Sequence, residues 1–177
     1  MFQSVLQFVF NNSALNMLGY SIEAESKTKF VVCFYSGILM GHMLSCVYSP
    51  EFLSLGTSCG TIALLPLEIC RYFRVKRVNY LASKKRKRFL FINLVINFVL
   101  NGLAIFNLDM VDWISHIGSI TSGVLLLFYF ENMKYISDFA FRNHKVIKRI
   151  SIALLVILYT VLIFTIFFYL PLVDEGR

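Results

Sequence analysis

Charged residues and proline are scarce in this chain of 177 residues. Only 15% of the residues are charged, where an average soluble domain has about a quarter. A soluble domain of this length could not cover its surface with so few charges, and the combination of three prolines with 18 phenylalanines excludes a disordered chain. Apolar residues make up 58% of the sequence, and the mean hydropathy is +0.70. This composition predicts an all-α polytopic membrane protein, a bundle of transmembrane helices.

Cysteine is also infrequent, and its placement excludes two kinds of site. The four cysteines lie inside apolar segments and form no Cys-x-x-Cys pair, so we interpret them as small buried hydrophobic residues. No group of residues has the spacing of metal ligands, and no glycine-rich loop could hold a phosphate. The sequence therefore predicts neither a disulfide framework nor a cofactor.

Six apolar runs are long enough to cross a bilayer, which requires about 20 residues per helix. We expect the chain to form one domain over residues 1–177, with a core at 1–130 and an additional C-terminal helix at about 150–172. The six runs are Phe2–Ile22, Phe30–Tyr48, Leu53–Phe73, Phe89–Asn107, Trp113–Phe130 and Ile150–Leu172.

The loops between these runs differ strongly in charge. Residues 24–29, 71–88 and 131–149 contain sixteen of the seventeen basic residues and all belong to one side of the predicted bundle. Basic loops remain in the cytoplasm, so both termini are expected on the opposite side. The run 84–88 would also suit an anionic-lipid patch or a nuclear-localisation string, although retention of a basic loop explains it more simply. We expect the lipid bilayer, and not nucleic acid, to be the surroundings of these charges.

Three clusters of polar residues interrupt the predicted spans. A polar group in hydrocarbon is costly, so such residues usually face inward and mark function. All three clusters lie in the outer part of spans that begin outside, so they are expected at a similar depth. They are Gln7 with Asn11, residues 56–60, and Ser115–His116 with Ser119, Ser122 and Gly123. A hydroxyl, an imidazole and a carboxamide at one level are the parts of a nucleophile, a general base and an oxyanion donor.

Three stretches of the chain resemble the rhomboid intramembrane serine proteases. Residues 10–15, followed by Gly19 and Glu23, are similar to the second core helix of that family. Residues 54–58 resemble its Gly-x-Ser nucleophile segment, and residues 113–119, continuing to Gly123, resemble its sixth helix with the catalytic histidine. The similarity covers roughly residues 3–130. It implies that the first five spans correspond to core helices two to six of the family.

The resemblance implies proteolysis of single-span transmembrane substrates near the outer face. Ser58 would attack the scissile carbonyl, and His116 would accept its proton. Asn11 and the backbone amide of Ser58 would hold the oxyanion, with Gln7 in an auxiliary role. Gly56 and Gly123 would allow close approach beside the two reacting groups.

An alternative is a rhomboid-like protein that is catalytically inactive and binds or escorts membrane helices. Gln7, Cys59, Ile62 and Ser119 depart from residues that many family members have at these positions. The match also begins almost at the second core helix, so either an apolar run precedes it or the chain is an abbreviated relative. Within the residues themselves, Ser58 could serve helix packing, and His42 is a second candidate for the base. A small transporter is a third possibility, weakened by the near absence of acidic residues in the spans. The sequence does not specify the oligomeric state.

Overall fold

The computed structural model describes residues 2–48, 57–78, 81, 84–92, 95, 113–131, 134 and 137–169, with the backbone alone at 2–7, 10 and 169. Every regular element within these ranges is helical, as the sequence predicts. The elements are α1 (Phe2–Glu23), α2 (Lys27–Tyr48), α3 (Thr57–Val78), a helical segment at 84–92, α5 (Trp113–Phe130), α6 (Asp138–Arg142), α7 (His144–Phe164) and the π-helical turn η3 (Thr165–Tyr169).

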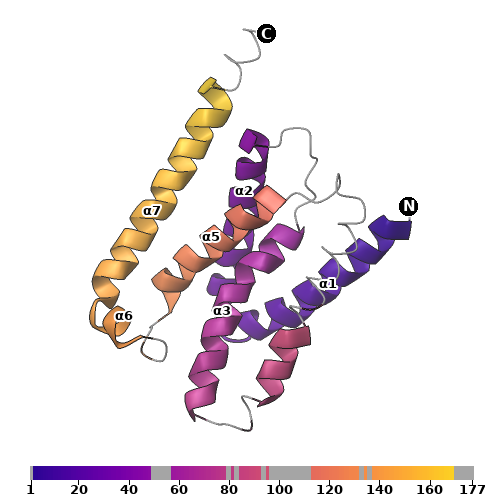
Figure 1. The fold of residues 1–177 in the computed structure, drawn as a ribbon, viewed down its shortest axis with the longest axis vertical. Helices are drawn as coiled ribbons and strands as arrows, with labels where there is room; N and C mark the ends of the chain where they lie inside the picture. Colours follow the sequence, from indigo (N-terminus) through magenta and orange to yellow (C-terminus); the bar gives the residue numbers. More distant parts are fainter. Residues whose placement is uncertain are drawn as a thin grey trace.

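The helices form a bundle whose centre is made by α2, α3 and α5. Each of these three packs against the other two, while α1 packs mainly on α3, and α7 covers α5 (Figure 1). The short helix α6 turns the chain between α5 and α7 at the lower end of the bundle in this view. Both α3 and α5 begin in its upper half and run downward (Figure 1).

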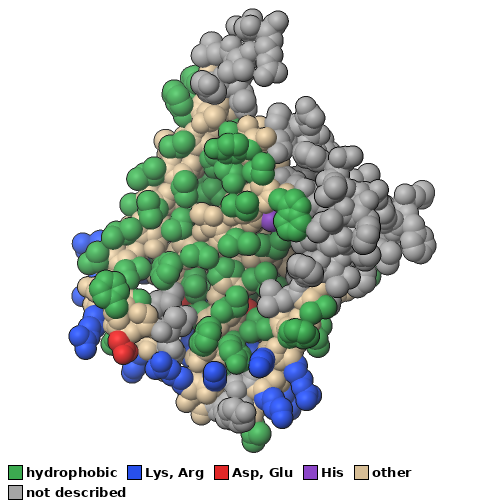
Figure 2. Space-filling view, viewed as in Figure 1, with side chains coloured by type: hydrophobic (Ala, Val, Ile, Leu, Met, Phe, Trp, Pro, Cys, Tyr) green, Lys and Arg blue, Asp and Glu red, His purple; other side chains and the backbone are tan. Residues whose placement is uncertain are grey.

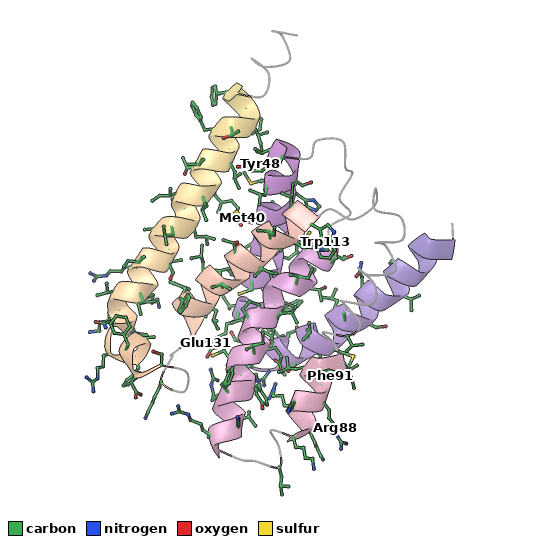
Figure 3. All side chains as sticks on the ribbon, viewed as in Figure 1. Met40, Tyr48, Arg88, Phe91, Trp113 and Glu131 are labelled. Atoms are coloured by element: carbon green, nitrogen blue, oxygen red, sulfur yellow. The ribbon has the colours of Figure 1, made fainter. Side chains whose placement is uncertain are left out.

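Glycines allow α2 to approach α5 very closely. A Cβ atom placed on Gly118 of α5 would lie 2.8 Å from the carbonyl oxygen of Met40 in α2. Figure 3 shows Met40 near the upper part of α5, on which Trp113 marks the first turn. Backbone contact of this kind is typical of helix pairs in membranes, where packing replaces the hydrophobic effect as the driving force.

Three of the described helices are long and apolar enough to cross a membrane. They are α2, α5 and the continuous helix His144–Phe168. Helix α3 has the same length as α2, 22 residues, but its inner half carries Glu68 and four basic residues. Most of the predicted fourth span, Phe89–Asn107, lies outside the described residues, so the count of six spans stays a prediction.

The observed helix bounds differ from the expected spans mainly at the basic end. Helix α2 begins at Lys27, three residues before the predicted span, and α7 begins at His144, six residues before it. In both cases the helix continues past the apolar run into charged sequence, because backbone hydrogen bonding does not depend on the polarity of the side chains. Figure 2 shows lysine and arginine side chains gathered along the lower end of the molecule. The apolar side chains occupy the surface above them.

Candidate functional site

Ser58 is the second residue of α3, and its side chain is half-buried. The first four backbone N–H groups of an α-helix have no acceptor within the helix, and the positive end of the helix dipole lies beside them. The amide of Ser58 belongs to this set. The hydroxyl and the amide of one residue are therefore located where a nucleophile and an oxyanion donor could act together. Gly56 lies outside the described residues.

His116 is the fourth residue of α5 and is also half-buried. Its ring meets the indole of Trp113 edge-on, with the ring centroids 6.1 Å apart and the planes at 82°. The aromatic neighbour of the histidine therefore comes from its own helix, one turn earlier. The sequence is consistent with this contact, because Trp113 and His116 are three residues apart and such residues are neighbours on a helix.

The beginnings of α3 and α5 converge on Gly41 of α2. A Cβ atom at Gly41 would lie 2.6 Å from the carbonyl oxygen of Ser115 and 3.1 Å from the sulfur of Cys59. These two residues are the direct sequence neighbours of His116 and Ser58. Both α3 and α5 therefore pack against the same glycine, next to the candidate nucleophile and the candidate base.

The two helices also contact each other directly further along. Gly123 of α5 packs on the carbonyl group of Ala63 in α3, one turn after Cys59 and two turns after Ser115. Both helices advance in the same direction (Figure 1). Gly123 is buried.

Asn11 lies half-buried in the middle of α1, while the side chain of Gln7 lies outside the described residues. Helix α1 is attached to α3 through its C-terminal half, where Ser21 contacts Glu68 and Arg71. Asn11 precedes Ser21 by about 15 Å along the helix. In Figure 1 the N-terminal half of α1 projects away from the start of α3. Ser58 and His116 therefore lie on two helices that pack against each other, whereas Asn11 lies on the part of α1 that projects away from them.

Three of the residues that depart from the family pattern, Cys59, Ile62 and Ser119, contribute to packing. Cys59 is completely buried against α2, and Ile62 is buried as well. The hydroxyl of Ser119 lies 2.7 Å from the carbonyl oxygen of Ser115 and 3.0 Å from that of Gly37. Its single proton is therefore donated either to its own helix or to α2. A serine is accommodated at this close contact because its hydroxyl has an acceptor there.

A cluster of hydroxyl groups, which the sequence did not reveal, joins three helices. The oxygen of Ser36 lies 2.7 Å from the hydroxyl oxygen of Ser122 and 2.8 Å from that of Tyr159. The Tyr159 hydroxyl also lies 2.8 Å from the backbone carbonyl oxygen of Ser36. These contacts attach α7 to α2 and α5. Only Ser122 belongs to a polar cluster that is visible in the sequence, because Ser36 and Tyr159 are far from it along the chain.

A second unforeseen cluster lies at the basic end of the bundle. Three acidic residues meet basic side chains from three segments of the chain, and two of the acids, Glu68 and Glu131, are 0% and 7% exposed. A buried carboxylate is stable only with such partners. The pairs are Glu25 with Lys29, Arg71 and Arg74, Glu68 with Arg71 and Arg86, and Glu131 with Lys29 and Arg74.

The loop carboxylate of this cluster is held in its charged form. Burial by itself would raise the pKa of Glu25. The hydrogen bond and positive charge of Lys29, with the charges of Arg74 and Arg71, outweigh burial and hold the pKa of Glu25 below its ordinary value. The cluster is thus structural, and it lies at the opposite end of the bundle from Ser58 and His116.

A comparison with protein families gives a match over most of the chain. The family model for the Rhomboid domain matches residues 1–133, which include α1, α2, α3 and α5 and end just after Glu131. No curated protein matches the chain, and no solved structure matches it. Helix α7 lies outside the matched range.

Proposed function

The chain belongs to the rhomboid family of integral membrane proteins, and on that basis we propose that it is an intramembrane serine endopeptidase. Ser58 is the nucleophile and His116 the general base. The substrate is a single-span transmembrane protein, cleaved near the outer end of its helix.

The chemistry follows from the two groups and their surroundings. A serine hydroxyl is a poor nucleophile until a base removes its proton, and a neutral imidazole can do this when it lies within about 3 Å. The serine oxygen then forms a bond to the scissile carbonyl carbon, and the carbonyl oxygen becomes an oxyanion. The backbone N–H of Ser58, at the start of α3, donates to this oxyanion, and Asn11 supplies a second donor from α1. His116 returns the proton to the leaving amine, and water then hydrolyses the acyl-enzyme.

The observation that supports this proposal most strongly is the convergence on Gly41. Cys59 and Ser115 meet that glycine from two helices, and their sequence neighbours are the proposed nucleophile and base. Both Ser58 and His116 are half-buried, whereas Cys59 is completely buried and faces α2. A residue of α3 that is to meet a substrate must be accessible, which favours Ser58 over Cys59 as the nucleophile.

The proposal is tested with the protein reconstituted into liposomes together with a transmembrane substrate whose helix contains destabilising residues. Cleavage by the parent is compared with that by Ser58→Ala and His116→Ala, and Ser13→Ala provides the matched control. Ser13 is an exposed helical serine whose hydroxyl donates only to the carbonyl of Val9. We expect cleavage by the parent and by the control variant, and none by the other two. Equal cleavage by all four proteins would contradict the proposal.

A fluorophosphonate probe separates the enzyme from an inactive relative. We expect the probe to label the parent at Ser58, and labelling to fall steeply in His116→Ala because the hydroxyl loses its base. If folded parent protein binds transmembrane substrates but is neither labelled nor able to cleave them, the inactive helix-binding alternative is correct.

We also propose that the basic end of the bundle faces the cytoplasm, because lysine and arginine are retained there during insertion. The test uses a protein without native cysteines, with a single cysteine introduced at an exposed residue of either end. Thr28→Cys at the start of α2 and Tyr48→Cys at its end form a matched pair. An impermeant maleimide applied to intact cells should label only Tyr48→Cys. Labelling of Thr28→Cys alone would show that the orientation is the opposite of the proposed one.

A further inference from the structure

A surface cavity of about 560 Å³, open to the surroundings, lies at the basic end of the bundle, where Tyr129 of α5 faces the first turns of α7. Its walls contain Tyr129 of α5 and six residues of α7, four of which are basic or titratable: His144, Lys145, Lys148 and Arg149. None of these residues takes part in the proposed peptidase site, which is at the other end of α5.

The positive charge in this cavity has no acidic partner among the described residues. The buried carboxylates of the neighbouring cluster, Glu68 and Glu131, pair with Lys29, Arg71, Arg74 and Arg86 and with none of the cavity cations. Lys148 is instead held over the ring of Tyr129, with its nitrogen 4.3 Å from the ring centroid. The aromatic ring orients the ammonium group on the cavity wall without neutralising it.

Lys145, Lys148 and Arg149 lie in the first two turns of α7, and Lys145 is in the turn where a cation is least favourable. α7 begins at His144, has no acidic residue in its first turn, and lacks a side-chain cap from Asn143. The N-terminus of a helix carries the positive end of the dipole and prefers anions. Three cations around a cavity at this position would be stabilised by an anion within it.

The wall of the cavity changes from charged to apolar along α7. Ile152 and Ala153 form its far side, and the same face of the helix continues at Val156, Ile163 and Phe167, all of which are exposed. Figure 2 shows the same order over the molecule, with lysine and arginine side chains at the lower end and apolar side chains above them. The order of basic side chains followed by apolar side chains matches the order of headgroup and acyl chain in an anionic phospholipid.

We propose that this cavity binds the headgroup of an anionic phospholipid. The phosphate lies among Lys145, Lys148 and Arg149, and the acyl chains lie along the exposed apolar face of α7. A soluble phosphate would use the same cations but would gain nothing from the apolar continuation.

The test measures binding of an acyl-labelled fluorescent phosphatidylglycerol to the purified full chain in detergent micelles, followed by fluorescence anisotropy. The first variant is Lys145→Gln with Lys148→Gln and Arg149→Gln. The matched control removes three charges elsewhere, through Lys84→Gln, Lys85→Gln and Lys87→Gln, whose side chains are exposed. Each lost cation should weaken binding about fivefold, so the first triple variant should bind on the order of 100-fold more weakly. The control should change binding by less than about threefold.

A second variant tests the cavity without changing the charge. Ile152→Trp fills the space beside the cations and should weaken binding at least about tenfold, provided that the variant elutes as a single species on size exclusion. This variant also keeps the proposal testable if the triple variant does not fold. Unlabelled phosphatidylglycerol should displace the probe, whereas phosphatidylcholine and inorganic phosphate should not.

Three results would overturn the proposal. Equal losses in the two triple variants would mean that the lipid responds to overall charge. Unchanged binding by folded Ile152→Trp would locate the lipid elsewhere. Full displacement of the probe by inorganic phosphate would make the site one for a soluble anion.

Discussion

Arg86 donates a hydrogen bond from Nε to Oε1 of Glu68 over 2.6 Å, although 18 residues separate them in the sequence. Its Nη2 also donates to the hydroxyl of Ser21, 2.9 Å away, and that hydroxyl lies 3.3 Å from the second oxygen of Glu68. The central residue of the basic run 84–88 is therefore turned toward the bundle, as is Leu90 four residues later. Lys84, Lys85, Lys87 and Arg88 remain exposed.

Replacing Glu68 by glutamine should destabilise the protein strongly. The change leaves the guanidinium of Arg86 in a mostly buried position without its charged partner, and breaking such a pair costs about 3 kcal/mol or more. Thermal unfolding in detergent measures the loss, with Glu23→Gln as the control, because Glu23 is exposed at the end of α1. A loss in Glu68→Gln no larger than that in the control would show that the pair contributes nothing.

Gly41→Ala should separate α2 from α5. The added methyl group would lie 2.5 Å from the hydroxyl oxygen of Ser119 and 2.6 Å from a backbone carbonyl, so the helices must move apart. We expect a loss of about 1–3 kcal/mol and the loss of probe labelling at Ser58. Gly19→Ala is the matched control, because the atoms nearest to its methyl group would belong to side chains, the ring of Phe30 at 2.9 Å and Leu15 at 3.5 Å. If the probe still labels Ser58 in Gly41→Ala, the site does not depend on the contact at Gly41.

Tyr159→Phe should loosen α7. The variant removes the hydroxyl that bonds to the side chain and the backbone of Ser36, at a cost of about 1 kcal/mol. Tyr20→Phe serves as the control, since Tyr20 is exposed. The double variant with Ser36→Ala completes a thermodynamic cycle, and additive losses in thermal unfolding would show that the two hydroxyls do not interact.

Stability should fall in acid partly through Glu25. Because the pKa of Glu25 is lowered in the folded protein, its contribution is complete above its ordinary pKa of about 4.5 and is lost as the pH falls through the folded value. The unfolding temperature of the parent should therefore decrease between about pH 5 and pH 3 more than that of Glu25→Gln. Parallel pH profiles for the two proteins would contradict this assignment.

The helical class of the fold and the positions of most helices followed from the sequence. Apolar runs of about 20 residues leave no other structure that satisfies the backbone in hydrocarbon. The end of α5 agrees with the prediction because the apolar run stops at Phe130, directly before Glu131. The starts of α2 and α7 were less predictable, because a helix that leaves the membrane can continue through charged residues.

Composition, charge and local spacing by themselves determined that this is a helical membrane protein and that Ser58 and His116 are the residues to test. These properties depend on neighbours within a few turns of one helix. Only the tertiary structure decided that Gly41 joins the helices of both residues, that Arg86 is turned toward Glu68, and that cations of α7 surround a cavity beside Tyr129. Each of these contacts joins residues that are distant in sequence, so their geometry depends on how whole helices pack, which no local pattern encodes.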